Sequence, residues 1–174
     1  MQKILLTLIF LLFHSLHAEV LISPLDAMHE HFGETATISK KNILLSNAKF
    51  KHIQAAAKAK LDTKIYRIYT AKEGTKVLGY GVLINRKVRS QNAVVLYVIS
   101  NNILKDIEII AFNETHEYLP SKKWSSQFHN TPTDKLLHLK KEIPSISGAT
   151  MSVRSITDAS RIAFALYNEL LKGK

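Results

Sequence analysis

Residues 93–112 read AVVLYVISNNILKDIEIIAF, and this stretch decides the fold class. Two apolar runs rich in β-branched residues flank Ser100-Asn101-Asn102, and such runs are typical of buried strands. Ser and Asn are favoured in tight turns, so the stretch predicts a β-hairpin. Extended patterns at 64–69 and 77–84 precede it along the chain. Consecutive strands joined by short turns predict an antiparallel meander sheet.

Helical patterns lie on both sides of the predicted strands. Pro120 and the Ser residues before two of the patterns are typical helix openers, and Gly33 is a typical terminator. The last pattern carries an apolar stripe at helical spacing, and Ser152 before it is predicted as its N-cap. The expected helices are 25–32, one that Ser46 or Asn47 caps and that runs to about 61, 121–128 and 153–171, with a short extended piece within 35–45 and a loop at 130–134. No repeat or linker interrupts them, so we expect one α+β domain, an antiparallel meander sheet flanked by helices.

The N-terminus reads as an export signal. Met1-Gln2-Lys3 is a short basic region, an apolar run covers 4–16, and Ala18 offers a small residue for cleavage. We therefore expect a signal peptide at 1–18, a domain at 19–174, and a location in the periplasm or on the extracytoplasmic face of the cytoplasmic membrane. The alternative is an uncleaved anchor. The chain has no cysteine, which excludes disulfides, cysteine-ligated clusters and a thiolate nucleophile.

The chain is basic, with a formal net charge of +10. Its lysines and arginines are scattered and lack the interleaved aromatic residues of a nucleic-acid-binding stripe. We therefore expect no nucleic-acid partner. A solvated basic surface facing anionic lipid headgroups is the interpretation that we favour.

Ser147-Gly148-Ala149-Thr150 stands immediately before the last predicted helix. A group attached to Thr150 would face the free backbone N–H groups of a helix N-terminus, which favour a phosphate. Gly148 and Ala149 add little bulk, so another molecule can approach the backbone closely. As a bare string the tetrapeptide is also compatible with a flexible loop.

The tetrapeptide resembles the flavinylation motif of the FMN-binding domain family, which includes peripheral flavin subunits of the sodium-pumping NADH:quinone reductase and the Rnf complex. The Gly79-Tyr80-Gly81 strand, the 103–112 strand, the segments 114–120 and 124–128 and the last helix are similar to small exported members. In that family an exported flavin transferase takes FMN from FAD, using magnesium, and esterifies its phosphate to the motif threonine, here Thr150.

The resemblance implies an FMN cofactor and an electron carrier rather than a stand-alone enzyme, with the flavin transferase and a membrane-bound redox partner as its partners. The expected cofactor-binding residues are Thr150, Ser147, Gly148, Ala149, Glu114 and Tyr118. No catalytic residue of the chain's own is expected. Trp124 and Gly79 with Gly81 are weaker candidates for the flavin surroundings, against roles in the core and in a β-bulge.

The family motif usually has an aspartate six residues before the threonine, and this chain has Pro144 there. Glu142 is the nearest acid and is two residues out of register. Both covalent and non-covalent FMN therefore stay open. Two further alternatives also stay open: an exported binding or assembly module that has lost the flavin, and a flavin-dependent reductase of a small extracytoplasmic acceptor. His29-Glu30-His31 is interpreted as a solvated helix face, and no metal site is expected.

Overall fold

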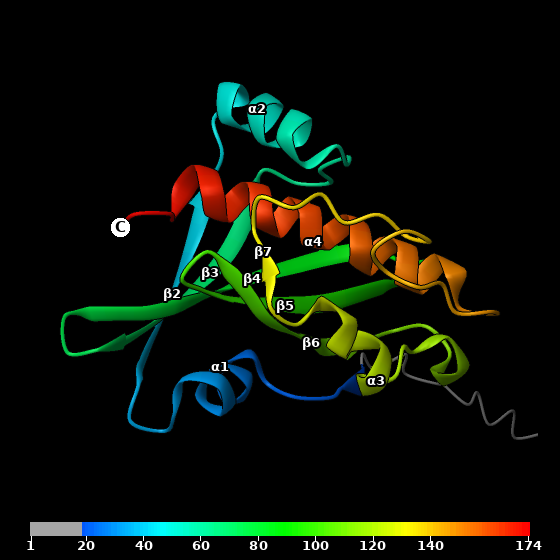
Figure 1. The fold of residues 1–174 in the computed structure, drawn as a ribbon, viewed down its shortest axis with the longest axis horizontal. Helices are drawn as coiled ribbons and strands as arrows, with labels where there is room; N and C mark the ends of the chain where they lie inside the picture. The colour runs from blue at the N-terminus through cyan, green and yellow to red at the C-terminus, as the bar shows by residue number, and fades with distance from the viewer. Residues whose placement is uncertain (1–18) are drawn as a thin grey trace, which may run out of the picture.

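The computed structural model describes residues 19–174, so the predicted signal peptide lies outside the described residues. They form one antiparallel sheet with helices on both faces (Figure 1). The strands run in the order β1-β6-β5-β4-β3-β2, and β7 pairs with β6. The strands are β1 (Glu19–Val20), β2 (Thr37–Leu44), β3 (Ile65–Glu73), β4 (Lys76–Lys87), β5 (Asn92–Ser100), β6 (Ile103–Phe112) and β7 (Thr131–Pro132). The predicted α+β meander is confirmed from β2 to β6.

The β5–β6 hairpin closes through Asn101 and Asn102, both in the left-handed region at φ 52° and 62°. Asparagine tolerates this conformation better than most residues, which is why the turn forms here. β6 begins and ends where the sequence predicts. The predicted loop at 130–134 instead contributes β7, whose two residues pair with the start of β6.

The helices are α1 (Pro24–Phe32), α2 (Asn47–Ala57), α3 (Lys122–Ser125) and α4 (Thr150–Leu170), with 3₁₀ turns at His116–Tyr118 and Ser126–Phe128. Ser23 and Ser46 cap α1 and α2 as expected: their hydroxyl oxygens accept the backbone N–H three residues ahead. Gly33 ends α1 at φ 90°. α2 is shorter than predicted, because Lys58 turns into the left-handed region at φ 47°. Between residues 19 and 174, no helix combines the length and apolarity needed to cross a membrane.

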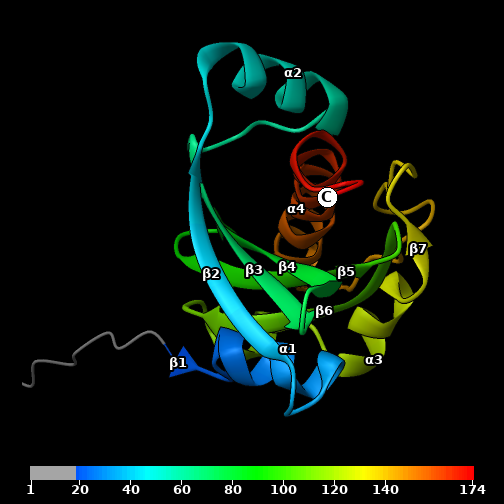
Figure 2. The ribbon, with the colours of Figure 1, turned by 90° about the vertical axis from the view of Figure 1, so that its left-hand side faces the viewer.

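α4 covers one face of the sheet with α2 above it, and α1 covers the opposite face (Figure 2). The main core lies between α4 and the sheet, where the fully buried Tyr97 donates a hydrogen bond to the carbonyl of Ile156 at 2.8 Å. A smaller core under α1 contains Met28, Tyr69 and Val98. The sheet therefore has two buried faces, which explains the apolar run of β5.

Gly79 and Gly81 leave room for side chains of the smaller core under α1. A Cβ on Gly79 would meet the ring of Phe32, and one on Gly81 would lie 2.6 Å from the sulfur of Met28. Both glycines thus admit α1 side chains onto the sheet, beside a β-bulge in the β3–β4 pair. The interpretation that they make room for a flat ring is therefore wrong, and the close approach is that of α1.

Candidate functional site

The candidate site is at the N-terminus of α4, which begins at Thr150. Ser152 lies inside the first turn and is 1% exposed, so its prediction as N-cap is wrong. Ala149 takes the N-cap position and makes no side-chain cap hydrogen bond. The backbone N–H groups of Thr150, Met151 and Ser152 precede the first hydrogen-bonded turn and have no partner within the helix. The tetrapeptide thus runs into an uncapped helix start.

Two hydrogen bonds hold this end of α4 against the sheet. The Ser155 hydroxyl donates to the carbonyl of Lys87 at 2.9 Å, and Tyr97 donates to Ile156 one residue further along. Lys87 is the last residue of β4, so the helix start lies beside the β4–β5 turn. Gly148 has φ 81° and nothing within 4 Å of the place where a Cβ would be, which leaves the backbone before Thr150 open.

A pocket of about 400 Å³ opens at this junction. Pockets that bind small ligands start at about 300 Å³, so the size suits a nucleotide-sized ligand that is partly exposed. Five of the six predicted cofactor residues line it. The lining residues are Val88, Arg89, Glu114, Tyr118, Gly148, Ala149, Thr150, Met151 and Ser152. Ser147, the sixth, is exposed and does not line the pocket.

Glu114 shapes the wall of this pocket. Its carboxylate accepts the backbone N–H of Gln91 at 2.6 Å, the backbone N–H of Ser90 and the Ser90 hydroxyl at 3.0 Å. These bonds, that of Gln91 foremost, hold the pKa of Glu114 below its ordinary value. The carboxylate therefore stays charged and orders the β4–β5 turn.

Tyr118 and Arg89 line the pocket together with the helix start. The guanidinium of Arg89 lies 5.2 Å from the centre of the Tyr118 ring, a cation–π arrangement. Tyr118 also packs against the buried cluster of Val88, Ala93 and Phe112. The sequence did not single out Arg89, because it stood among scattered basic residues. Its place in a turn between two predicted strands was the available signal.

The segment before the tetrapeptide is anchored through Trp124. The indole N–H donates to the carbonyl of Pro144 at 2.8 Å, and the ring packs edge-on against Phe128 at 5.2 Å between centroids. Trp124 is 6% exposed, so it belongs to the core and does not line the pocket. Glu142 accepts the backbone N–H of His138 at 2.8 Å, which lowers its pKa. It therefore closes its own turn and does not replace the aspartate of the family motif.

The sequence suggested that His29 and His31 share one solvated face of α1, but the structure places them in different surroundings. His31 is half-buried, and its Nε2 lies 3.2 Å from Oε1 of Glu108 on β6. The contact with Glu108 raises the pKa of His31 above its ordinary value, against the opposing effect of burial. His29, two residues earlier, stays near the surface with Nδ1 3.2 Å from the carbonyl of Gly33.

Residues 90–165 match the family model described as the FMN-binding domain. This segment is an FMN-binding domain. It runs from the β4–β5 turn into α4 and contains Glu114, Tyr118 and the whole tetrapeptide. No curated protein matches the chain. The match confirms, for residues 90–165, the FMN-binding domain family expected from the sequence, and this domain indicates FMN as the cofactor.

The residues of the pocket fit FMN. Three backbone N–H groups at the start of α4 and the Arg89 guanidinium suit the phosphate, and Tyr118 with the exposed Met151 offers apolar surface for the ring system. The bound cofactor supplies the redox chemistry, because flavins exchange electrons that protein side chains do not. The protein's part is to hold the phosphate end and to shape the surroundings of the ring.

Proposed function

We propose that the protein is an extracytoplasmic electron carrier whose FMN is esterified through its phosphate to Thr150. The observation that carries the proposal is that Thr150 opens α4 in the same pocket as Arg89, Glu114 and Tyr118. A phosphate on Oγ1 would face the unpaired N–H groups of the first helical turn, and the dipole of a 21-residue helix favours its negative charge.

The Thr150 hydroxyl requires an external catalyst. Its hydroxyl donates to the carbonyl of Ile146 at 3.3 Å, a long hydrogen bond to a group that cannot act as a base. A threonine hydroxyl without a base is a weak nucleophile. In the proposed step, a flavin transferase with magnesium cleaves the pyrophosphate bond of FAD. The Thr150 oxygen bonds to the FMN phosphorus, AMP leaves, and the hydroxyl proton passes to the transferase.

Non-covalent FMN is the second candidate, and Pro144 favours it. The family's aspartate is absent at this position, and the carbonyl of Pro144 is engaged by Trp124. Glu142 is engaged in its own turn. A transferase that recognises a carboxylate six residues before the threonine would find Pro144 at that position. The pocket residues named above would then hold FMN through the phosphate and the ring alone.

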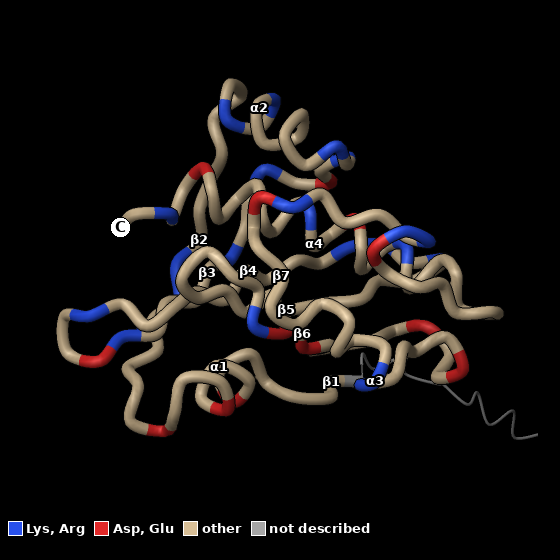
Figure 3. Tube along the Cα trace, viewed as in Figure 1, with Lys and Arg blue, Asp and Glu red and all other residues tan. Residues whose placement is uncertain are grey.

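The distribution of charge supports a membrane-facing orientation. α2 carries Lys49 and Lys51 and no acidic residue, whereas α1 carries Asp26 and Glu30 and neither lysine nor arginine. Figure 3 shows basic residues over α2 and acidic ones on α1. We propose that the α2 side faces an anionic membrane surface, where a membrane-bound redox partner exchanges electrons with the flavin.

The test is the mass of the intact protein. The full chain is expressed with its own N-terminal segment and an exported flavin transferase, then purified and denatured. We expect a mass increase of one FMN minus one water, which Thr150→Ala abolishes and Thr150→Ser retains. Thr115→Ala, which removes an exposed threonine outside the pocket, is the matched control and keeps the flavin.

Three outcomes would contradict parts of the proposal. Yellow colour that is lost on denaturation would replace the ester by non-covalent binding. An ester that persists in Thr150→Ala would place the attachment at another residue. Turnover with small acceptors, measured on the loaded protein, would replace the carrier by a reductase.

A further inference from the structure

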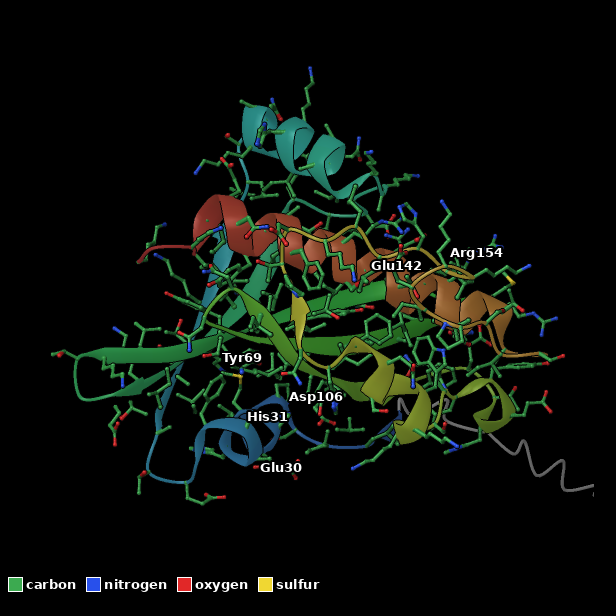
Figure 4. All side chains as sticks on the ribbon, in the orientation of Figure 1. Glu30, His31, Tyr69, Asp106, Glu142 and Arg154 are labelled. Atoms are coloured by element: carbon green, nitrogen blue, oxygen red, sulfur yellow. The ribbon has the colours of Figure 1, made fainter. Side chains whose placement is uncertain are left out.

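A second cluster of polar side chains lies on the face of the sheet that α1 covers. His31 comes from α1 and Asp106 from β6 (Figure 4). Glu108 also comes from β6. His129, just after the second 3₁₀ turn, places its Nε2 2.7 Å from Oδ1 of Asp106. One ligand atom each from His31, Asp106 and Glu108 lies within 4.8 Å of the others. None of these residues lines the pocket at Thr150.

A β-bulge brings the two carboxylates together. Leu104 pairs with Ile99 and points into the core under α4. Two residues later Asp106 would point the same way in a regular strand, because side chains alternate. The register shifts between these pairs, so Asp106 pairs with Val98, whose side chain belongs to the core under α1. The extra residue therefore places Asp106 on the same face as Glu108, a re-aiming that bulges perform next to functional sites.

The oxygen atoms of Asp106 have different surroundings. Oδ1 accepts the backbone N–H of Ile107 at 2.7 Å and lies within hydrogen-bonding distance of His129. Oδ2 faces His31, with 4.0 Å between Oδ2 and Nε2. Partners of this kind fix a carboxylate so that its other oxygen can bind a metal.

The spacing suits a small divalent ion. Metal–ligand bonds of about 2.1 Å place neighbouring ligand atoms about 3.0–3.4 Å apart in octahedral or tetrahedral sites. The His31–Glu108 distance of 3.2 Å already lies in this range, and the His31–Asp106 distance of 4.0 Å needs a closure of well under 1 Å. Two carboxylates also balance the charge of a divalent ion.

The cluster borders a cavity of about 990 Å³. Asp106, Glu108 and His129 line it together with Glu30 and Lys122. An ion held by three protein ligands would keep its remaining coordination positions open toward this space. In Figure 4 His31 and Asp106 lie beside each other.

We propose that His31, Asp106 and Glu108 bind a divalent transition-metal ion of the Zn²⁺, Mn²⁺ or Fe²⁺ class, with His129 as a positioning residue. One imidazole with two carboxylates suits these ions, since all-oxygen sites favour Ca²⁺ and Mg²⁺ and thiolate ligands are absent from the sequence. The site is independent of the flavin attachment, because it lies on the other face of the sheet.

The test is calorimetric titration of the chelator-treated full chain with Zn²⁺ and with Mn²⁺, and with Ca²⁺ for comparison. We expect one equivalent of Zn²⁺ or Mn²⁺ to bind and Ca²⁺ to bind at least tenfold more weakly. His31→Gln and Asp106→Asn should each weaken Zn²⁺ binding by at least tenfold. His29→Gln, on the same helix outside the cluster, is the matched control and should bind as the unsubstituted protein does.

His129 has a separate expectation. His129→Ala should weaken binding by about tenfold, and His129→Gln, which can still donate to Oδ1, should restore most of it. Thermal unfolding of each metal-free variant shows whether it is folded. Absence of Zn²⁺ and Mn²⁺ binding to the folded unsubstituted protein would overturn the proposal, and so would binding that His31→Gln and Asp106→Asn leave unchanged.

Discussion

We expect Arg161→Met to lower the free energy of unfolding strongly, because Arg161 is a buried junction between α4 and its neighbours. The side chain donates to the carbonyls of Ala57 at 3.0 Å, Leu137 at 2.7 Å and Lys58 at 3.3 Å, and to Asp158 at 2.8 Å. It thereby ties the end of α2 and the loop after β7 to α4. Only 8% of the residue is exposed.

The magnitude follows from the groups left without a partner. Methionine keeps the aliphatic packing but donates nothing, so the carbonyls of Ala57 and Leu137 lose their charged donor inside the protein. Each buried polar group without a partner costs about 1–3 kcal/mol. Asp158, with a side chain 28% exposed, regains water and adds little. We therefore expect a loss of about 3 kcal/mol and a fall in Tm of about 6–12 °C for a domain of this size.

The assay is urea unfolding followed by the emission of Trp124, the chain's single tryptophan, which is buried and becomes exposed on unfolding. Arg154→Met is the matched control, because Arg154 lies on the exposed side of the same helix, and it should change the free energy by about 0.5 kcal/mol or less. If Arg161→Met and Arg154→Met unfold within about 0.5 kcal/mol of each other, the contacts of Arg161 contribute nothing net and the reasoning is wrong.

Three further substitutions test the packing around the sheet and the flavin pocket. Gly79→Ala should cost about 2 kcal/mol in urea unfolding, because its Cβ would lie 2.7 Å from the carbonyl oxygen of Ile99, which cannot move aside; an unchanged midpoint would contradict this. Glu114→Gln should remove a pH-dependent part of the free energy of unfolding. Because the pKa of Glu114 is lower in the folded state, its charged form stabilises the fold above the unfolded pKa of about 4.3, and this stabilisation is lost as the pH falls through the folded pKa. The difference in unfolding free energy between the two proteins should therefore shrink from about pH 6 to 3. Trp124→Phe should lower the free energy of unfolding by about 1 kcal/mol and reduce flavin loading, measured by absorbance, because it removes the hydrogen bond to Pro144 that holds the segment before the tetrapeptide. Full loading would show that this bond does not matter for the pocket.

The hairpin at 93–112 could be predicted because its signals are local. Two apolar runs and a pair of asparagines suffice to place β5, β6 and the turn between them. The register shift before Asp106 could not be predicted, since it depends on how β6 pairs with β5. The start of α4 was placed too late, because Ser152 is a typical N-cap residue whose burial against the sheet outweighs that preference.

The flavin pocket was predicted better than its surroundings. Thr150 and Glu114 stand out in the sequence beside a helix start and a strand end. Arg89 did not, because a basic turn residue looks like ordinary surface until the fold brings it to Tyr118. Trp124 was undecided between a flavin contact and the core, and its burial, together with its bond to Pro144, assigns it to the core. Residues that meet across elements are visible only once the elements are packed.

The flavin pocket and the proposed metal site lie on opposite sides of the sheet. The polypeptide leaves β6 through the 3₁₀ turn His116–Tyr118, where His116 lines the large cavity and Tyr118 lines the flavin pocket. The acidic residues of α1 and β6 lie on the side that attracts a cation, and the basic residues of α2 lie beyond α4 on the other. A membrane surface that attracts the basic side would leave the cation-binding side facing away from it, because opposite charges cannot both be favoured at one anionic surface. The proposed metal site and the proposed membrane contact are therefore compatible, and each can be removed by substitution without disturbing the other.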